Sequence, residues 1–373
     1  MRFPEFTKEW IYKTIDEIFE LRNGYTPSKA NQSFWNNGTI PWFRMEDIRL
    51  NGGVLYDAIQ HITPEAVKGS GLFEPYSIIL ATTATIGEHA MIIADSLANQ
   101  RFTNFKVRKS LSHRYDPYYL YYYFFRIDEW CLKNTNAGGL LSVDIPSLKR
   151  KAIYAPLLDE QTKIVKLLRL IDERIATQNK IIEDLKKLKS AISLKMLHSD
   201  SWEQFKIKDI ASIGRGRVIS SIEISQQENP LYPVYSSQTS NEGIMGYLDN
   251  YMFEGEYISW TTDGANAGTV FYRNGKFNCT NVCGLLKLRN GFDTHFVSLV
   301  LSEATKKYVS INLANPKLMN NTMGNIQIRL PKFEEQKRIS IIFKKLQELL
   351  DVQKHLLCKY SKQKQYLLHQ MFI

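Results

Sequence analysis

The sequence predicts an α+β protein in which two similar mixed α/β domains are separated by two long antiparallel helices that form a coiled coil. Three observations lead to this prediction. Two apolar seams have coiled-coil spacing, one motif recurs at the head of each seam, and the segments before the seams repeat the same order of short elements. Such an internal repeat gives the chain a pseudo-two-fold organisation.

The first long helix is predicted to begin at Pro156 and to continue to about residue 199. Asp159 and Glu160 fall in its first turn, where acidic side chains suit free backbone N–H groups and the positive end of the helix dipole. Apolar residues then recur at steps of four and three, which keeps them on one seam when the helix packs along another helix. At about 1.5 Å per residue the rod is roughly 60 Å long. The seam residues are Ile164, Leu168, Ile171, Ile175, Gln178 and Ile182.

The same pattern recurs at the second helix, which is predicted over residues 331–373. Pro331 and the pair Glu335-Gln336 repeat Pro156 and Glu160-Gln161 at a shift of 331 − 156 = 175 residues. The same shift places Gln178, the one polar residue of the first seam, on Gln353 of the second. An amide pair near the middle of an antiparallel seam could fix the register of the two helices. The second seam consists of Ile339, Phe343, Leu346, Leu350, Gln353 and Leu357.

The first domain is predicted over residues 1–155 as a mixed α/β unit. Asp116 followed by proline is typical of a helix N-cap, and the aromatic run behind it, residues 118–125, is predicted to be core rather than a base-stacking platform. The expected elements are a short helix at 10–18, a strand at 39–43, a strand pair at 74–83, a strand at 101–108, a helix at 117–130 and a strand at 148–154.

The second domain, residues 200–330, is predicted to repeat the first with shorter loops. A shift of 192 carries Trp10 to Trp202 and Gly24 to Gly216. Further on, the pair Thr82-Thr83 meets Thr261-Thr262 at a shift of 179, and later positions match at 181. The predicted order is therefore domain, helix, domain, helix, with boundaries at 1–155, 156–199, 200–330 and 331–373.

Composition indicates the kind of partner. The chain has 373 residues, a formal net charge of +10 and a pI near 9.2. This balance favours an anionic partner, with nucleic acid ahead of a membrane surface. Four cysteines in a chain of this size are typical of a reducing compartment, and the sequence shows no secretory or transmembrane segment. We therefore expect a cytoplasmic protein without a membrane partner.

Three repeated motifs also resemble a known family. They are the 10–18 pattern followed by Gly24, the loop-strand motif at 81–87, and the proline with its Glu-Gln pair. Together they resemble the specificity subunit of type I restriction-modification systems over essentially the whole chain. The resemblance implies that each domain is a target-recognition domain for one half of a split sequence in double-stranded DNA. One departure is the longer, polar segment 260–268 in the second domain.

The resemblance also implies partners and a division of labour. The long helices would space the two half-sites and bind methyltransferase subunits, two per complex, and restriction subunits would join through that complex. The methyltransferase subunit would use S-adenosylmethionine, whereas this chain would hold no cofactor and would not be an enzyme.

The residues agree with a non-catalytic chain. The sequence Asp116-Pro117-Tyr118-Tyr119 lacks the second proline of an amino-methyltransferase motif, and Gly214-Arg215-Gly216 lacks the residues of a phosphate loop. Cys279 and Cys283 are spaced like half a zinc site without the second pair, so no metal is expected. A self-contained DNA enzyme is therefore disfavoured. The alternative that remains is a non-enzymatic coiled-coil scaffold that binds proteins through its two domains.

Candidate DNA-binding residues lie in or beside the predicted loops. Arginine can bond guanine bidentately and Asn or Gln can bond adenine, although any one of these arginines could equally be a solvated surface residue. A glycine in the loop at 135–139 could let the backbone approach DNA, or could be a plain hinge. The candidates are Arg22, Arg44, Thr82, Thr83, Gln100, Arg101, Gly138, Arg215, Arg217, Thr261, Thr262 and Asn281.

Overall fold

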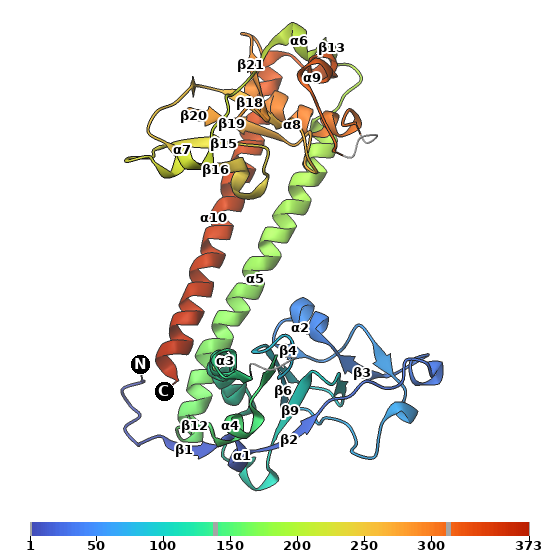
Figure 1. The fold of residues 1–373 in the computed structure, drawn as a ribbon, viewed down its shortest axis with the longest axis vertical. Helices are drawn as coiled ribbons and strands as arrows, with labels where there is room; N and C mark the ends of the chain where they lie inside the picture. The colour runs from blue at the N-terminus through green and yellow to red at the C-terminus, as the bar shows by residue number, and fades with distance from the viewer. Residues whose placement is uncertain (1, 137–140, 311–314, 373) are drawn as a thin grey trace. The chain divides into compact units, whose positions relative to one another are not determined.

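The computed structural model describes residues 2–136, 141–310 and 315–372, and the chain divides into two compact units. The first unit comprises residues 1–179 with 355–373, and the second comprises residues 180–354. Each unit holds one mixed α/β domain together with part of α5 (Leu158–Met196) and part of α10 (Phe333–Met371), drawn in green and red in Figure 1. The two mixed domains and two long helices of the prediction are confirmed.

The first domain is built on a five-stranded sheet of order β2-β9-β6-β7-β4, with smaller sheets β5-β3-β8, β1-β12 and β10-β11 beside it. The strands are β1 (Ile11–Thr14), β2 (Phe19–Asn23), β3 (Ile40–Phe43), β4 (Val54–Leu55), β5 (His61–Ile62), β6 (Ser77–Ala81), β7 (His89–Ile92), β8 (Leu97–Ala98), β9 (Phe102–Val107), β10 (Thr135–Asn136), β11 (Ser142–Val143) and β12 (Ala152–Ala155). Its α-helices are α1 (Ile15–Ile18), α2 (Met45–Asn51), α3 (Pro117–Lys133) and α4 (Ile145–Arg150).

The second domain has two four-stranded sheets, β14-β21-β18-β19 and β16-β15-β20-β17, and the pair β13-β22. The strands are β13 (Glu203–Lys206), β14 (Ala211–Arg215), β15 (Tyr232–Tyr235), β16 (Ile244–Leu248), β17 (Phe253–Glu254), β18 (Tyr257–Thr261), β19 (Val270–Arg273), β20 (Lys276–Cys279), β21 (Cys283–Leu288) and β22 (Gln327–Leu330). Its helices are α6 (Ile207–Ile210), α7 (Ser221–Ser225), α8 (Thr294–Ala304) and α9 (Asn320–Asn325).

The two domains share one framework. The strand order β2-β9-β6-β7 in the first domain reappears as β14-β21-β18-β19 in the second. In both, the strand before the long helix pairs antiparallel with the first strand of the domain, as β1-β12 and β13-β22. These equivalent pairings confirm the internal repeat.

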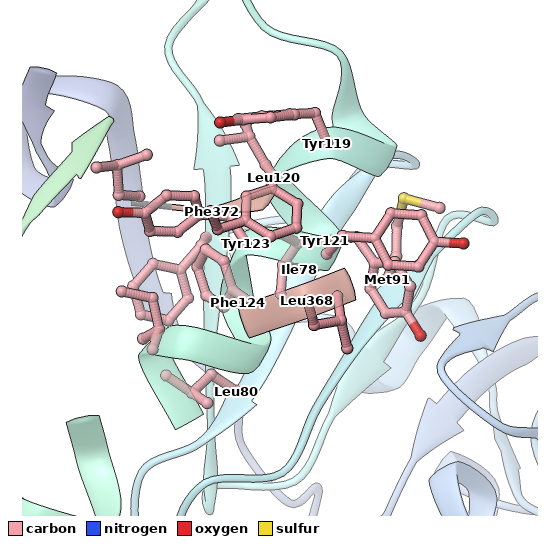
Figure 2. Close-up of a cluster of buried hydrophobic side chains, with 14 of the residues drawn as sticks. Ile78, Leu80, Met91, Tyr119, Leu120, Tyr121, Tyr123, Phe124, Leu368 and Phe372 are labelled. Atoms are coloured by element: carbon pink, nitrogen blue, oxygen red, sulfur yellow. The ribbon is translucent and has the colours of Figure 1, made fainter. Parts of the chain in front are cut away.

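The aromatic run of α3 forms the core of the first unit, together with the end of α10 (Figure 2). The ring of Phe372 lies 5.2 Å from that of Tyr119 and 5.6 Å from that of Tyr123, measured between centroids. Leu368 packs into the same cluster, and Phe124 is fully buried in it. The prediction that this run is core is therefore confirmed, because its side chains face the sheet and the helix pair.

Within each unit the two long helices run antiparallel. In the first unit the Lys364 ammonium lies 2.7 Å from the Asp172 carboxylate, and Arg174 lies over the ring of Tyr360. In the second, Lys189 donates to the Gln347 side chain at 2.8 Å. The seam residues are buried at Ile164, Leu168, Ile171, Gln178, Ile182, Ile339, Phe343 and Leu350, and half-buried at Ile175, Leu346, Gln353 and Leu357.

A buried glutamine ties the start of α5 to the first domain. The side-chain oxygen of Gln161 accepts from the backbone N–H of Asp116 at 2.9 Å. Its side-chain nitrogen donates to the carbonyl oxygens of Arg114 and Pro156, at 3.0 and 2.9 Å. Because Asp116 is also the N-cap of α3, this one amide connects two helix starts.

Gln336 makes the equivalent connection in the second domain. Its side-chain oxygen accepts from the backbone N–H of Asp293 at 3.0 Å, and its nitrogen donates to the carbonyl of Pro331 at 2.8 Å. Asp293 is the N-cap of α8. The recurring proline and glutamine therefore form a hydrogen-bonded clamp at each helix start.

Three local predictions in the first domain were wrong. Residues 10–18, predicted as a helix, form the strand β1 and only a single turn, α1, because pairing with β12 outweighs the local spacing. Residues 74–83 hold one strand, β6, whose partner β7 follows the turn at Gly87, a glycine with φ of +80°. Residues 148–154, predicted as strand, contain the end of α4 before β12 begins.

We expect Gln161→Leu to destabilise the first unit by about 3 kcal/mol, because it leaves one buried N–H and two carbonyls without their partner. Urea unfolding of the full chain would measure the change. Lys166→Leu on the exposed side of α5 is the matched control and should change the unfolding free energy by less than about 0.5 kcal/mol. Equal effects of both substitutions would contradict the clamp.

The second domain should lose stability as the pH falls through the range of His295. Burial in α8, with the Lys344 charge nearby, lowers the pKa of His295 to about 4, and its Nδ1 lies 2.9 Å from the Ser340 hydroxyl of α10. The unfolded chain takes up this proton near its ordinary pKa of 6.5, so the stabilisation is complete above pH 6.5 and disappears as the pH falls toward 4.

His295→Gln should therefore flatten the dependence of the unfolding free energy on pH between 6.5 and 4. Thermal unfolding across this range would measure it, with His198→Gln at an exposed site as the control. A slope that is identical in the wild type and His295→Gln would count against this role.

Candidate nucleic-acid interface

Loops of the first domain gather at one edge of its central sheet. Because β2, β9 and β6 are neighbours in antiparallel order, the ends of β2 and β6 lie beside the start of β9. The backbone N–H of Gly24 donates to the carbonyl of Phe102, and that of Thr82 donates to the carbonyl of Arg101, both at 2.9 Å. We call these loops the first rim, defined as residues 23–26, 82–85, 99–101 and 141–143.

The second domain has the same arrangement. The backbone N–H of Arg217 donates to the carbonyl of Cys279 at 3.2 Å, and that of Thr262 donates to the carbonyl of Val282 at 3.3 Å. The N–H of Leu318 in turn donates to the carbonyl of Thr262 at 2.8 Å, which brings in the segment before α9. The second rim is defined as residues 215–217, 261–264, 280–282 and 316–320.

A glycine is needed where the chain enters each rim. A Cβ atom on Gly24 would lie 2.3 Å from the carbonyl oxygens of Ala98 and Asn99. On Gly216 it would lie 1.5 Å from the carbonyl oxygen of Cys279. These distances are too short for any side chain, so the recurrence of Gly24 as Gly216 reflects close backbone packing.

The predicted threonines are mostly buried supports of the rims. The hydroxyl of Thr82 lies 3.0 Å from that of Thr103, and the hydroxyl of Thr262 donates to the carbonyl of Val282 at 2.9 Å. Thr261 is 1% exposed and accepts from the N–H of Thr269. Buried hydroxyls that are already bonded cannot reach a base, so we revise their predicted role to shaping the loops. Thr83 is half-buried in the first rim.

The hydrogen bonds also correct the predicted pairing of these threonines. The backbone carbonyl of Thr82 accepts from the N–H of Val143, and that of Thr262 accepts from the N–H of Leu318. Val143 and Leu318 each lie in the segment before the next helix of their domain. Thr82 therefore matches Thr262, a shift of 262 − 82 = 180 rather than 179.

Two of the predicted arginines are already bonded to other groups of their own domains, Arg22 while partly buried and Arg217 while exposed. Arg22 donates to the carbonyls of Ser70 and Leu72 and stacks over the ring of Phe73, and its burial lowers the pKa of its guanidinium. Both terminal nitrogens of Arg217 bond the Glu223 carboxylate, which raises the pKa of Arg217.

The other arginines lie at or beside the rims. Arg44 begins α2 next to the first rim, where its backbone N–H donates to the Asp47 carboxylate and its Nε lies 3.8 Å from the Glu46 carboxylate in an ion pair. Arg101 is exposed on the first rim. Arg215 is half-buried at the end of β14, and its Nε donates to the side-chain oxygen of Asn320 at 2.9 Å.

Amides complete the exposed part of each rim. Gln100 is exposed and bonds the Thr26 hydroxyl, and Asn281 is exposed at the equivalent turn of the second rim. Gly138 falls within 137–140, outside the described residues. The structure therefore brings together arginine and amide side chains, which are the donors and acceptors that read base edges.

Sequence reasoning missed two features. Asn320 was not singled out, although the polar run Asn320-Asn321-Thr322 replaces Ile145-Pro146-Ser147 of the first repeat and could have marked it. The first domain also carries a cleft of about 340 Å³, lined by Lys29, Gln32, Trp35, Asn36 and Gln60. Four of these residues fall within 29–36, and only the fold brings Gln60 to them, so the sequence did not identify the cleft.

Within residues 2–136, 141–310 and 315–372, no three metal-ligating side chains come together. Cys279 and Cys283 are both buried free thiols at the base of the second rim. No helix in this described part of the chain has an apolar stretch long enough to span a membrane.

The type I restriction modification DNA specificity domain matches the chain twice, over residues 7–187 and 199–359. The chain belongs to this family. Each match covers one domain with much of the helix that follows it. Family membership supports two target-recognition domains and favours the DNA-specificity interpretation over the protein scaffold.

Known relatives agree with this assignment. The EcoprrI specificity subunit of Escherichia coli is 32% identical, over 91% of this chain and 88% of its own length. The MpnII specificity subunit of Mycoplasma pneumoniae is 43% identical over 143 residues, which cover 38% of this chain and 42% of that protein. The type I S subunit of M. genitalium has the same fold, with a TM-score of 0.66 at 18% identity over 100% of this chain and 99% of that one.

Proposed function

We propose that the chain reads a split sequence in double-stranded DNA, one half-site per domain, as the non-catalytic subunit of a type I restriction-modification complex. The observation that carries the proposal is the pair of rims, which share one backbone framework but present different side chains. A protein that recognises two different half-sites needs the same backbone framework in both domains, with different hydrogen-bonding side chains on each.

Equivalent positions show the difference. Asn23 in the first rim corresponds to Arg215 in the second, and Gln100 corresponds to Asn281. The net charge of +10 supports binding to the phosphate backbone, which carries no sequence information. The rims would then provide the base contacts, while lysines elsewhere on the domains track phosphate.

The catalytic work is assigned to other subunits. The chain lacks an amino-methyltransferase motif, so we propose that a methyltransferase subunit holding S-adenosylmethionine modifies adenines in the site. Two such subunits per chain would suit the internal repeat, and restriction subunits would join through them. The chain would hold no cofactor of its own and would act in the cytoplasm.

Exposed apolar side chains on the long helices support subunit docking there. Ile341, Leu349 and Val352 of α10 are 53%, 42% and 54% exposed, and their spacing places them on one side of the helix. On α5, Ile181 and Leu188 are exposed one heptad apart. Apolar residues that avoid the seam are typical of a surface that a second helix covers.

The first test is to co-express the full chain with its methyltransferase subunit and map adenine methylation on genomic DNA. We expect a split motif in which one half changes when residues 200–330 are exchanged for those of a relative and the other half stays the same. Absence of both complex and methylation would overturn the proposal and return the protein scaffold as the better explanation.

Leu349→Glu combined with Val352→Glu should weaken binding to the methyltransferase subunit on the order of 100-fold, because two apolar contacts are lost and charges are buried. Calorimetry on the purified proteins would measure it, with circular dichroism to show that the chain remains folded. Lys354→Glu, an exposed charge change on another side of α10, is the control and should bind normally. Full binding by the double variant would exclude this docking face.

A further inference from the structure

Arg215 is the arginine of the second rim that the domain orients without neutralising. Its Nε donates to the side-chain oxygen of Asn320 at 2.9 Å, which fixes the plane of the guanidinium. Nη1 lies 3.4 Å from the carbonyl of Asn281, and Nη2 lies 3.7 Å from the sulfur of Met319. Among the described residues no carboxylate lies within 4 Å of the Arg215 guanidinium, so no group of the domain neutralises its positive charge.

The terminal edge of this guanidinium remains available. Each terminal nitrogen carries two N–H groups, and the long contacts to Asn281 and Met319 use at most one of each. One N–H group on each terminal nitrogen therefore remains for a ligand, and two donors on neighbouring nitrogens of one planar group form a fork. Such a fork matches the O6 and N7 acceptors that guanine presents in the major groove, the commonest specific arginine contact to DNA.

Neighbouring positions lack this combination. Arg217, two residues away, has both terminal nitrogens on the Glu223 carboxylate. In the first domain the equivalent residue is Asn23, whose side-chain oxygen accepts from the Thr103 hydroxyl at 3.0 Å. The oriented arginine therefore distinguishes the second rim from the first.

We propose that Arg215 reads a guanine in the half-site of the second domain, and that Asn320 is the residue that positions it. The inference rests on the proposed function, because it assigns a base to one of the two domains. Arg215 then acts as a specificity residue that contacts DNA. Asn320 acts through Arg215, since its amide oxygen is already used on Nε.

The experiment uses the complex of the full chain with its methyltransferase subunit and duplexes that contain the mapped motif. Each guanine of the half-site that changes with residues 200–330 is replaced in turn by 7-deazaguanine, which lacks the N7 acceptor. We expect one replacement to weaken binding by about 10- to 100-fold in the wild type. The same replacement should have no further effect in Arg215→Ala, which shows that the two groups contact each other.

Two further variants separate positioning from folding. Asn320→Ala should lose preference at that same base pair only. Asn320→Asp should retain the preference, because a carboxylate still accepts from Nε, while its added negative charge weakens binding to all sequences alike. Arg289→Ala, at an exposed arginine that follows β21 outside the second rim, is the arginine control and should keep the wild-type preference at every base pair. A general loss of binding in Asn320→Ala at all positions would overturn its positioning role.

Other outcomes overturn the inference without touching the proposed function. They are a split motif whose second half has no guanine on either strand, or no wild-type sensitivity to 7-deazaguanine there. Equal weakening by Arg215→Ala on all sequences, with a salt slope shallower by about one, would identify a phosphate contact instead. Absence of any split motif would mean that the proposed function itself has failed.

Discussion

The hydrogen-bonded glutamine at the head of each long helix is the interaction on which the arrangement of each unit depends. An amide that is buried without partners costs free energy, so Gln161 and Gln336 stabilise the fold only when helix start, proline turn and domain helix are all in place. Asp116 and Asp293 complete the connection, because each caps the domain helix whose first turn packs nearby. The direction in which a long helix leaves its domain is therefore set by short polar contacts as well as by apolar packing.

The sequence predicted the long helices well because their pattern is local and long. Over 39 residues, a repeated seam outweighs the ambiguity of any single position. It could not predict the role of Gln161, whose partners Arg114 and Asp116 lie more than forty residues earlier and become neighbours only in the fold. Residues 10–18 were wrongly predicted as a helix, because pairing with β12, which lies far away in the sequence, decides the structure of β1.

In the predicted interface, too, the local features could be predicted from the sequence and the long-range contacts could not. Turn residues, polar loops and recurring glycines located both rims, because loop chemistry is written in neighbouring residues. The contacts of each side chain could not be predicted in the same way, because Arg22 and Arg217 bond to partners that only the tertiary structure brings near. Thr262 was chosen for its hydroxyl, yet that hydroxyl is what holds the loop together. Polar residues near a binding edge thus divide into those that build it and those that it presents.

Phe372 and Leu368 complete the aromatic core of the first domain, although the whole second domain is translated between α3 and these residues. At ribosomal speeds of about 5–20 residues per second, the first domain waits tens of seconds for its last core side chains. The second unit is one continuous stretch, residues 180–354, and needs no such wait. A nascent chain therefore exposes its tyrosine-rich α3 while the later half is already able to fold, a period in which chaperone binding would matter most.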